Sequence, residues 1–363
     1  MPVKQRLTFQ PDLLAWYDHA AADLPWRRTR DPYHVWLSEI MLQQTQVETV
    51  IPYYERFLSA FPTVEALAAA PLDDVLKLWE GLGYYSRARN LHRAAQMMIH
   101  DMGGHIPTTA DGWQQLPGIG RYTAGAIASI AFEEVAPVLD GNVIRVFARL
   151  LDLDADVTQN ATKNDLWQYA ENWMPDERPG DYNQALMELG RTICKPRNPL
   201  CGQCPIQAHC LAFAHGTQDE RPVRAKRTAT PHYDVAAGII WNQNGKVLIA
   251  QRPLDGLLGG LWEFPGGKQE PDESLPECLK RELREELAIE VRVGELFVVV
   301  KHGFTHFKIT LHAFTCDYVS GPPQSLGVRD WAWVPPHQLD TYSFGKADRE
   351  IVAALKARNN MLF

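Results

Sequence analysis

Apolar residues recur every three to four positions through most of the first half of the chain, which is the period of an α-helix. One helix is expected to begin after Asp31-Pro32, which is typical of an N-cap followed by proline, and to run through Val47. Short turns with glycine or proline separate this helix from the later ones. Further helices are predicted over residues 72–79, 87–99, 122–132 and 143–151.

The pattern changes after residue 232, where apolar runs of strand length begin. Asn244-Gly245 lies between the first two runs and is typical of a hairpin turn. A helix is predicted between the later strands, so this part of the chain is expected to be an α/β domain. The predicted strands cover residues 235–241, 246–251, 291–300 and 307–318, and the helix covers 275–287.

Residues 215–232 separate the two patterns and are polar, which indicates an interdomain linker. The segment carries Arg221, Arg224, Lys226 and Arg227. This basic run is either a plain solvated connector or also a contact to a phosphate backbone.

Composition narrows the class of protein. A chain of 363 residues with 45% hydrophobic and 22% charged residues is too apolar for wholesale disorder and long enough for two or three domains. Its net charge of −8 argues against a general polyanion binder but leaves room for a local nucleic-acid site. Neither a membrane-spanning apolar stretch nor a signal-peptide core is evident, so we expect a cytoplasmic protein.

Four of the six cysteines fall close together, with the spacing C-x6-C-x2-C-x5-C. A disulfide scaffold would spread cysteines through a small secreted domain, so this clustering favours a metal site. Only one C-x2-C pair is present, whereas zinc sites usually have two, so the pattern favours iron–sulfur. The remaining two, Cys278 and Cys316, are predicted to be buried free thiols. The clustered residues are Cys194, Cys201, Cys204 and Cys210.

A glycine-rich turn containing Gly118 and Gly120 stands directly before the predicted helix at residue 122. Its amides could bind a phosphate, although a tight connection between two helices is the alternative interpretation. Asp140 begins a later helix, where an ionised carboxylate caps the positive end. Glu39 instead lies among apolar residues, which would raise its pKa unless it is simply exposed. One protonated and one ionised carboxyl group are what cleavage of a glycosidic bond requires.

These features together resemble the helix-hairpin-helix DNA glycosylases that carry a 4Fe–4S cluster. Three segments, 36–45 (WLSEIMLQQT), 79–85 (WEGLGYY) and 138–142 (VLDGN), are similar to the MutY adenine DNA glycosylase family, as is the stretch of Phe304, Thr305 and His306. The resemblance covers essentially the whole chain. It implies excision of adenine mispaired with 8-oxoguanine or guanine in duplex DNA, after the adenine is flipped out of the stack.

The resemblance also implies a role for individual residues. Glu39 would protonate adenine N7, Asp140 would stabilise the oxocarbenium ion, and Tyr122 and Asn142 would support these two carboxyl groups. Where endonuclease III needs a nucleophilic lysine, this chain has Tyr122, so a monofunctional glycosylase is expected. Arg27 and Gln184 would line the adenine pocket, and Phe304, Thr305 and His306 would read the lesion. The residues expected to probe or wedge beside 8-oxoguanine are Gln44, Thr45, Leu82 and Tyr84.

The implied architecture is multidomain: an all-α helix-hairpin-helix glycosylase core, made of a helical barrel and an iron–sulfur helical lobe, followed by an α/β Nudix-like domain. Residues 26–131 would form the barrel, and residues 1–25 with 132–214 would form the lobe. Residues 233–363 would form a Nudix-like domain that recognises 8-oxoguanine. We expect a monomer whose partner is double-stranded DNA.

The C-terminal domain also carries a nearly intact Nudix motif, which departs from the pattern only in having Ala288 where the late glycine is expected. Its Glu282, Glu285 and Glu286 share one helical face and could bind Mg²⁺, although a solvated acidic face is the alternative. Residual Mg²⁺-dependent pyrophosphohydrolase activity on oxidised nucleotides is therefore a second hypothesis. A non-catalytic iron–sulfur module is a third, but it gives Glu39, Tyr122 and Asp140 no role.

Overall fold

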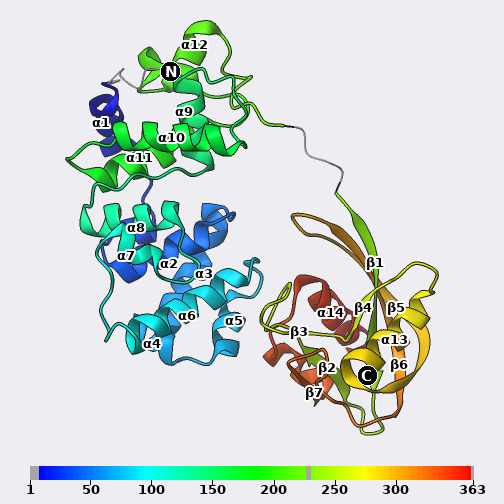
Figure 1. The fold of residues 1–363 in the computed structure, drawn as a ribbon. Coiled ribbons are helices and arrows are strands. Elements are labelled where there is room, and N and C mark those ends of the chain that lie inside the picture. The colour runs from blue at the N-terminus through cyan, green and yellow to red at the C-terminus, as the bar shows by residue number, and fades with distance from the viewer. Residues whose placement is uncertain (1–7, 226–229, 361–363) are drawn as a thin grey trace. The chain divides into compact units, whose positions relative to one another are not determined.

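The computed structural model describes residues 8–225 and 230–360, apart from the side chains of the last two. Contacts divide the chain into two compact units, and Figure 1 labels their elements. The helical unit comprises Met1–Ala69 and Asn90–Arg227, and the sheet unit comprises Ala70–Arg89 and Thr228–Phe363. Lys226 and Arg227 of the expected linker lie outside the described residues.

The described part of the helical unit consists of helices and their connections. Phe9 packs edge-on against Trp173, with ring centroids 5.5 Å apart, and so joins the start of the chain to a helix far along the sequence. Trp36 and Trp113 form a second aromatic contact in the core, at 5.6 Å. The elements are α1 (Gln10–Ala20), η1 (Pro25–Arg27), α2 (Pro32–Leu42), α3 (Val47–Ala60), α4 (Val64–Ala69), most of α6 (Ser86–His100), α7 (Ala110–Gln114), α8 (Arg121–Phe132), α9 (Gly141–Leu150), α10 (Asn160–Asn172), α11 (Pro179–Thr192), η2 (Cys201–Gln203), η3 (Gln207–His209) and α12 (Leu211–His215).

Helix α2 begins as predicted, because Asp31 Oδ1 accepts hydrogen bonds from the backbone N–H groups of Tyr33 and His34, at 2.9 and 3.2 Å. The prediction of one helix through Val47 is wrong. Helix α2 ends at Leu42, and Gln44 adopts a left-handed backbone with φ of 57° before α3 begins. The residues of this turn are polar but compatible with a helix. The sequence has no glycine or proline here that would mark the end of the helix.

Much of the expected linker is held on the helical unit. Val157 N–H donates to Val223 O at 3.1 Å, and the Arg149 guanidinium donates to the carbonyls of Gln218 and Arg221. Arg221 also pairs with Asp152 at 2.9 Å. These contacts hold residues 218–223 on the helical unit, so this part of the segment is not a plain solvated connector.

The sheet unit contains a seven-stranded sheet in which β1 pairs with β6 in parallel and the other pairings are antiparallel. The strands follow the order β3-β2-β1-β6-β5, with β4 beside β1 and β7 beside β2. The predicted Asn244-Gly245 hairpin is confirmed, since Trp241 pairs with Val247. The elements are α5 (Leu72–Trp79), β1 (His232–Trp241), β2 (Val247–Gln251), β3 (Trp262–Glu263), β4 (Gly266–Lys268), α13 (Leu275–Leu287), β5 (Glu290–Gly303), β6 (Lys308–Ser320), β7 (Asp330–Val334), η4 (Pro336–Thr341) and α14 (Lys346–Asn360).

Alternation along β1 places a helix on each face of this sheet. Ala237 and Ile239 pack in one core with residues of α14 such as Ile351. Ala236 and Ile240 point the opposite way and pack with Leu279 and other residues of α13. Cys278 and Cys316 are both buried in this second core, which confirms them as buried free thiols.

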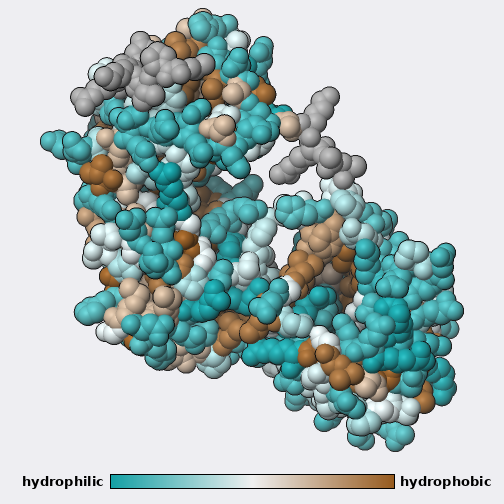
Figure 2. Space-filling view, viewed as in Figure 1, coloured by the Kyte–Doolittle hydropathy of each residue, from teal (hydrophilic) through white to brown (hydrophobic). Residues whose placement is uncertain are grey.

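The face drawn in Figure 2 is mainly hydrophilic, with apolar side chains in scattered patches. No helix among the described residues is long and apolar enough to cross a membrane.

Candidate active site

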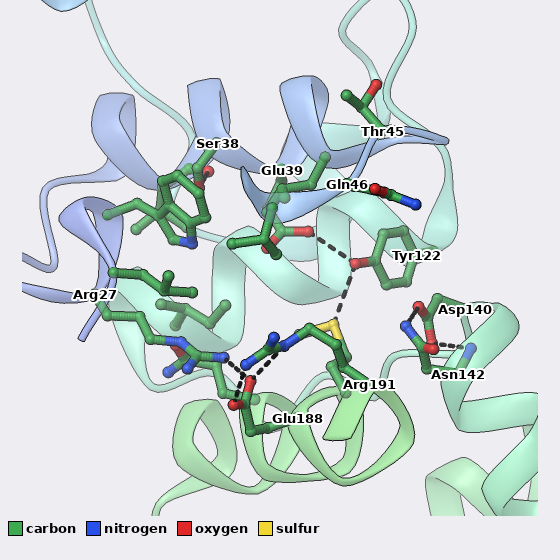
Figure 3. Close-up of a pocket in the computed structure, with 18 of the residues that line it drawn as sticks. Arg27, Ser38, Glu39, Thr45, Gln46, Tyr122, Asp140, Asn142, Glu188 and Arg191 are labelled. Atoms are coloured by element: carbon green, nitrogen blue, oxygen red, sulfur yellow. Dashed lines mark hydrogen bonds and ion pairs between the residues drawn. The ribbon is translucent and has the colours of Figure 1, made fainter. Parts of the chain in front are cut away.

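A cavity of about 510 Å³ lies in the helical unit, between α2, α8, α11 and the start of α9 (Figure 3). It brings together residues that are far apart in sequence, and they include both carboxyl groups of the expected glycosidic chemistry. Of the residues proposed from the sequence, Glu39, Asp140, Tyr122, Asn142, Arg27, Gln184 and Thr45 line this cavity.

Glu39 is held in the cavity by a helix that is buried on nearly all sides. Its exposure is 6%, which excludes the alternative of a solvated helix residue. Tyr122 donates its phenolic O–H to Glu39 Oε2 at 2.8 Å, as the dashed line in Figure 3 marks. Burial raises the pKa of Glu39 to about 7, and the nearby Asp140 acts in the same direction while Tyr122 opposes it. Glu39 can therefore hold a proton near neutral pH.

Asp140 lies across the cavity at the N-cap of α9. Its carboxylate accepts hydrogen bonds from the backbone N–H groups of Asn142 and Val143, at 2.9 and 2.7 Å, and from Asn142 Nδ2 at 2.9 Å. Burial raises the pKa of Asp140, whereas these three donors lower it. The capping interpretation and the cavity position are thus both correct, because one carboxylate serves the helix start and faces the cavity.

Arg145 connects this carboxylate to the segment that carries the cysteines. Its guanidinium donates to Asn142 Oδ1 at 2.8 Å and to the carbonyl of Cys194 at 2.7 Å. Because Asn142 in turn donates to Asp140, a continuous chain of hydrogen bonds runs from Asp140 to the backbone of Cys194.

Three further charged residues line the cavity that the sequence analysis did not single out: Glu48, Glu188 and Arg191. Glu188 is almost fully buried and accepts hydrogen bonds from Arg27 Nη2 at 3.0 Å and from Arg191 Nη2 at 2.5 Å. Hydrogen bonds and charge from these two guanidinium groups lower the pKa of Glu188 despite burial, so it stays ionised. Helical spacing could have found two of these residues, since Glu188 and Arg191 follow Gln184 at i+4 and i+7 on α11.

The four clustered cysteines line one small pocket beside α9. Arg149 is 2% exposed and donates to Cys194 Sγ at 3.2 Å, and it also donates to backbone carbonyls such as those of Gln218 and Lys195. A buried cation with this set of partners fits the negative charge of thiolates around a cluster. Among the described residues, no three side chains of the ligating types are placed to hold a single ion. The spacing of the cysteines along the sequence therefore remains the reason to favour a cluster over zinc.

The glycine-rich turn has the backbone that glycine allows. Gly118 has a φ of 77°, and a Cβ there would lie 2.7 Å from the Cβ of Asn90. Gly120 is the N-cap of α8, and a Cβ there would meet open space. Gly118 is thus required by the turn, while Gly120 leaves the start of α8 unobstructed for an approaching phosphate.

A second cavity, of about 460 Å³, lies within the sheet unit. It is lined by Tyr84, which follows α5, and by Phe304, Thr305 and His306, which lie between β5 and β6. Tyr84 and Thr305 share a hydrogen bond of 2.7 Å between their hydroxyl groups. Leu82 is buried in the same turn as Tyr84 but does not line this cavity, and Gln44 is an exposed turn residue of the helical unit.

The carboxylates of the Nudix motif are engaged by an arginine. Arg281 donates to Glu282 Oε1 at 2.9 Å and to Glu285 Oε2 at 3.2 Å, and it also pairs with Glu273. Glu286 has its Oε2 atom buried, and its pKa is raised to about 7 by burial and by Glu282. No three ligating side chains of the described motif converge on one point, so the expected Mg²⁺ site is not supported by this geometry.

Comparison with known proteins agrees with this arrangement. The model for HhH-GPD superfamily base excision DNA repair proteins matches residues 37–172, and the model for the iron–sulfur binding domain of endonuclease III matches 194–210. The model for the NUDIX domain matches 236–354. The adenine DNA glycosylase of Rattus norvegicus is 39% identical over an aligned length of 380, and the alignment covers 90% of this chain and 73% of that protein. This chain belongs to the adenine DNA glycosylase family.

A second adenine DNA glycosylase and two solved structures of other enzymes agree with this result. The Homo sapiens adenine DNA glycosylase is 38% identical over an aligned length of 408, and the alignment covers 96% of this chain and 74% of that protein. A solved thermostable thymine-DNA glycosylase superimposes with a TM-score of 0.53 at 30% identity and covers 58% of this chain and 97% of its own. An endonuclease III–DNA covalent intermediate, at 23% identity and a TM-score of 0.50, shares the fold over 60% of this chain. The expected glycosylase fold, iron–sulfur segment and Nudix-like domain are therefore confirmed.

Proposed function

We propose that this enzyme removes adenine mispaired with 8-oxoguanine or guanine in duplex DNA, by hydrolysing the N-glycosidic bond and leaving the DNA backbone intact. The observation that carries the proposal is a protonatable Glu39 and a hydrogen-bonded Asp140 in one cavity of about 510 Å³. Such a cavity is large enough for a flipped-out purine.

The residues of the cavity support a stepwise reaction. Glu39, protonated near neutral pH, gives its proton to adenine N7. The bond between N9 and C1′ then breaks, and its electron pair leaves with the neutral base. Asp140 stabilises the positive charge that develops on the sugar. Water adds at C1′, and its proton returns to a carboxylate, so atoms and charge balance.

Two charged groups at the far side of the cavity favour adenine over other bases. The ionised Glu188 can accept a hydrogen bond from the exocyclic amino group of adenine, whereas the carbonyl that guanine carries at that position would be repelled. Arg27 holds this carboxylate at 3.0 Å and also lines the cavity. Gln184, one helical turn before Glu188, adds an adaptable amide to the same wall.

The residues around the cavity also support a monofunctional enzyme. A glycosylase that cleaves the backbone needs an amine to form a Schiff base with the sugar. None of the described residues that line the cavity is a lysine, and Tyr122 occupies the start of α8. Borohydride trapping on DNA is therefore expected to capture only a minor fraction of the enzyme.

The second cavity supports recognition of 8-oxoguanine. Phe304 and Phe307 stack with ring centroids 4.6 Å apart and offer an aromatic face, while Thr305 and Tyr84 offer hydroxyl groups. An aromatic face suits a base, and a hydroxyl can donate or accept a hydrogen bond at the edge of the oxidised purine. His306 is exposed beside them.

The four cysteines would hold a 4Fe–4S cluster, which is expected to be structural or to tune DNA affinity. Cys194, Cys201, Cys204 and Cys210 line the pocket, and Arg149 supplies a counter-charge. Beyond this role, no step of the reaction needs the cluster. Residual pyrophosphohydrolase activity is not proposed, because Arg281 engages two of the carboxylates that Mg²⁺ would need.

Single-turnover adenine release tests the proposal with three duplexes, in which adenine stands opposite 8-oxoguanine, guanine or thymine. We expect release from the first two and none from the adenine–thymine pair. No release from any duplex, by protein that shows the visible absorbance of its cluster, would refute the function. Equal release from all three would refute recognition of the mispair.

A further inference from the structure

We propose that the ion pair between Glu80 and Arg349 is a positioning element for lesion recognition. It holds the turn that carries Tyr84 against the loop that carries Thr305. In this way it sets the preference for adenine opposite 8-oxoguanine over adenine opposite guanine. The inference rests on the proposed function, since it concerns how the second cavity is kept in shape.

Several donors converge on the Glu80 carboxylate, which directly follows α5. Arg349, in the first turn of α14, donates to both Glu80 oxygens, with the Nη2 contact at 3.0 Å. Phe344 N–H donates to Oε1 at 3.1 Å, and Lys77 Nζ donates to Oε2 at 2.8 Å. The side chains of Glu80 and Arg349 are 19% and 23% exposed, so this bidentate pair is shielded from solvent more than an ordinary surface pair.

Hydrogen bonds between a charged and an uncharged group continue the same junction. Arg89 donates to Gly259 O at 2.7 Å, and Gln251 donates to Asp73 Oδ1 at 3.1 Å. Lys77 also donates to Tyr342 O at 3.1 Å. Glu80 and Arg349 are the two oppositely charged side chains that meet directly across this junction, and a bidentate pair fixes orientation as well as distance.

The turn after Glu80 is built so that a displacement at its start reaches Tyr84. Gly81, Gly83 and Tyr84 all have positive φ angles, of 95°, 77° and 48°. Trp79 Nε1 donates to Gly83 O at 3.1 Å, and Gly81 N–H donates to the Tyr85 hydroxyl at 3.1 Å. These bonds leave the turn little freedom to absorb a movement locally.

The opposite wall of the cavity is tied to the same helix as Arg349. Lys346 and Ala347, at the start of α14, line the second cavity together with Phe304 and Thr305. Arg349 follows within the same helical turn. The pair therefore links one wall, through Glu80, to the other, through α14. Losing it should widen the gap between the Tyr84 and Thr305 hydroxyl groups, which is 2.7 Å.

A double-mutant cycle tests the inference. Glu80→Gln, Arg349→Met and the double variant are compared with wild type in single-turnover adenine release opposite 8-oxoguanine and opposite guanine. Each single variant should lower the ratio of these two rates about tenfold, as expected for losing a charged hydrogen-bonded pair, and should keep the rate opposite guanine within about twofold. The double variant should lower the ratio of rates no further than the more strongly affected single variant does, because both changes remove the same interaction.

Controls separate this role from general damage. Asp74→Asn makes the same chemical change at an exposed position of α5 and should leave the ratio unchanged. Arg349→Lys keeps the charge but loses the fork of donors, so it should give an intermediate ratio, and it replaces Arg349→Met if that variant unfolds. Thermal unfolding and the visible absorbance of the cluster should match wild type.

The outcomes distinguish the two claims. If wild type itself releases adenine equally opposite 8-oxoguanine and guanine, lesion recognition by the second cavity is refuted. If wild type discriminates and the Glu80 and Arg349 variants discriminate equally well, only the positioning role is overturned. A parallel loss of both rates, or strictly additive effects in the cycle, also overturns it.

Discussion

Replacing Tyr122 with phenylalanine should shift the pH dependence of adenine release to higher pH. Burial raises the pKa of Glu39 to about 7 even though the Tyr122 O–H, which donates to Glu39 Oε2 at 2.8 Å, lowers it. A hydrogen bond to a charged group contributes roughly 1.5–3 kcal/mol, and about 1.4 kcal/mol corresponds to one pKa unit. Without it, the pKa of Glu39 should rise by about one to two units.

The sign follows from the role of Glu39 as an acid. Only protonated Glu39 can give a proton to the base, so the rate falls as pH rises through the pKa of this residue. In wild type the fall should centre near pH 7, and in Tyr122→Phe it should lie above that value. The absolute rate at low pH should drop only modestly, since the acid remains protonated there.

Single-turnover adenine release over a pH series measures the inflection directly. Tyr182→Phe is a matched control, because Tyr182 is also buried in the helical unit and its hydroxyl has no hydrogen-bond partner among the described residues. Its inflection should coincide with that of wild type. An inflection in Tyr122→Phe that stays in place or moves to lower pH would refute the coupling between Tyr122 and the ionisation of Glu39.

Four further predictions concern the acid, the lesion and the cluster. Glu39→Gln should reduce adenine release by about 10²–10⁴-fold, and an unchanged rate would remove Glu39 as the acid. In urea unfolding, the same variant should be more stable than wild type above pH 7 by up to about 3 kcal/mol. The raised folded-state pKa of Glu39 favours its protonated form, so wild type loses stability as pH rises from about 4.5 to about 7, and the glutamine does not. A variant that is no more stable than wild type at high pH would contradict the burial argument. In competition between 8-oxoguanine and guanine duplexes, Thr305→Ser should keep the preference for 8-oxoguanine and Thr305→Ala should reduce it several-fold. Equal preference in these two variants would argue against a role for the hydroxyl group. Cys204→Ser should lose the visible absorbance of the cluster and unfold at a lower temperature, whereas a variant with the wild-type spectrum would exclude Cys204 as a ligand.

The sequence predicted the fold well where local chemistry decides it. Asp31, Asp140 and the Asn244-Gly245 turn all act as their residue types suggest, because caps and tight turns depend on a few neighbouring atoms. The end of α2 was missed because the turn through Gln44 contains neither glycine nor proline. The left-handed backbone of Gln44 is set by the packing of the helices before and after it, and glutamine itself has no preference for this conformation.

The candidate site shows the same limit. Glu39 and Asp140 could be identified by their contrasting local settings, since one lies in an apolar helix and the other at a helix start. Glu188 and Arg191 were missed because a charged residue within a helix is usually solvated, and their helical spacing from Gln184 was the one signal that pointed to the cavity wall. The Mg²⁺ hypothesis stays a prediction: sequence spacing put the glutamates on one face, and in the structure Arg281 bonds two of them.

The pairing of the first helix with late segments has a consequence for how the chain matures during synthesis. Gln10 donates to the carbonyl of Trp173, 163 residues away, and Arg178 bonds Asp18 across a similar separation. Helix α1 can therefore form these contacts only after α10 and α11 have emerged from the ribosome. The contacts of the helical unit are complete only when the hydrogen bond between Val157 and Val223 has formed. The cysteines at 194–210 emerge within this last stretch. A cluster held by all four cysteines can therefore form no earlier than this last stretch of the helical unit, whereas the strands of the following domain are made later still.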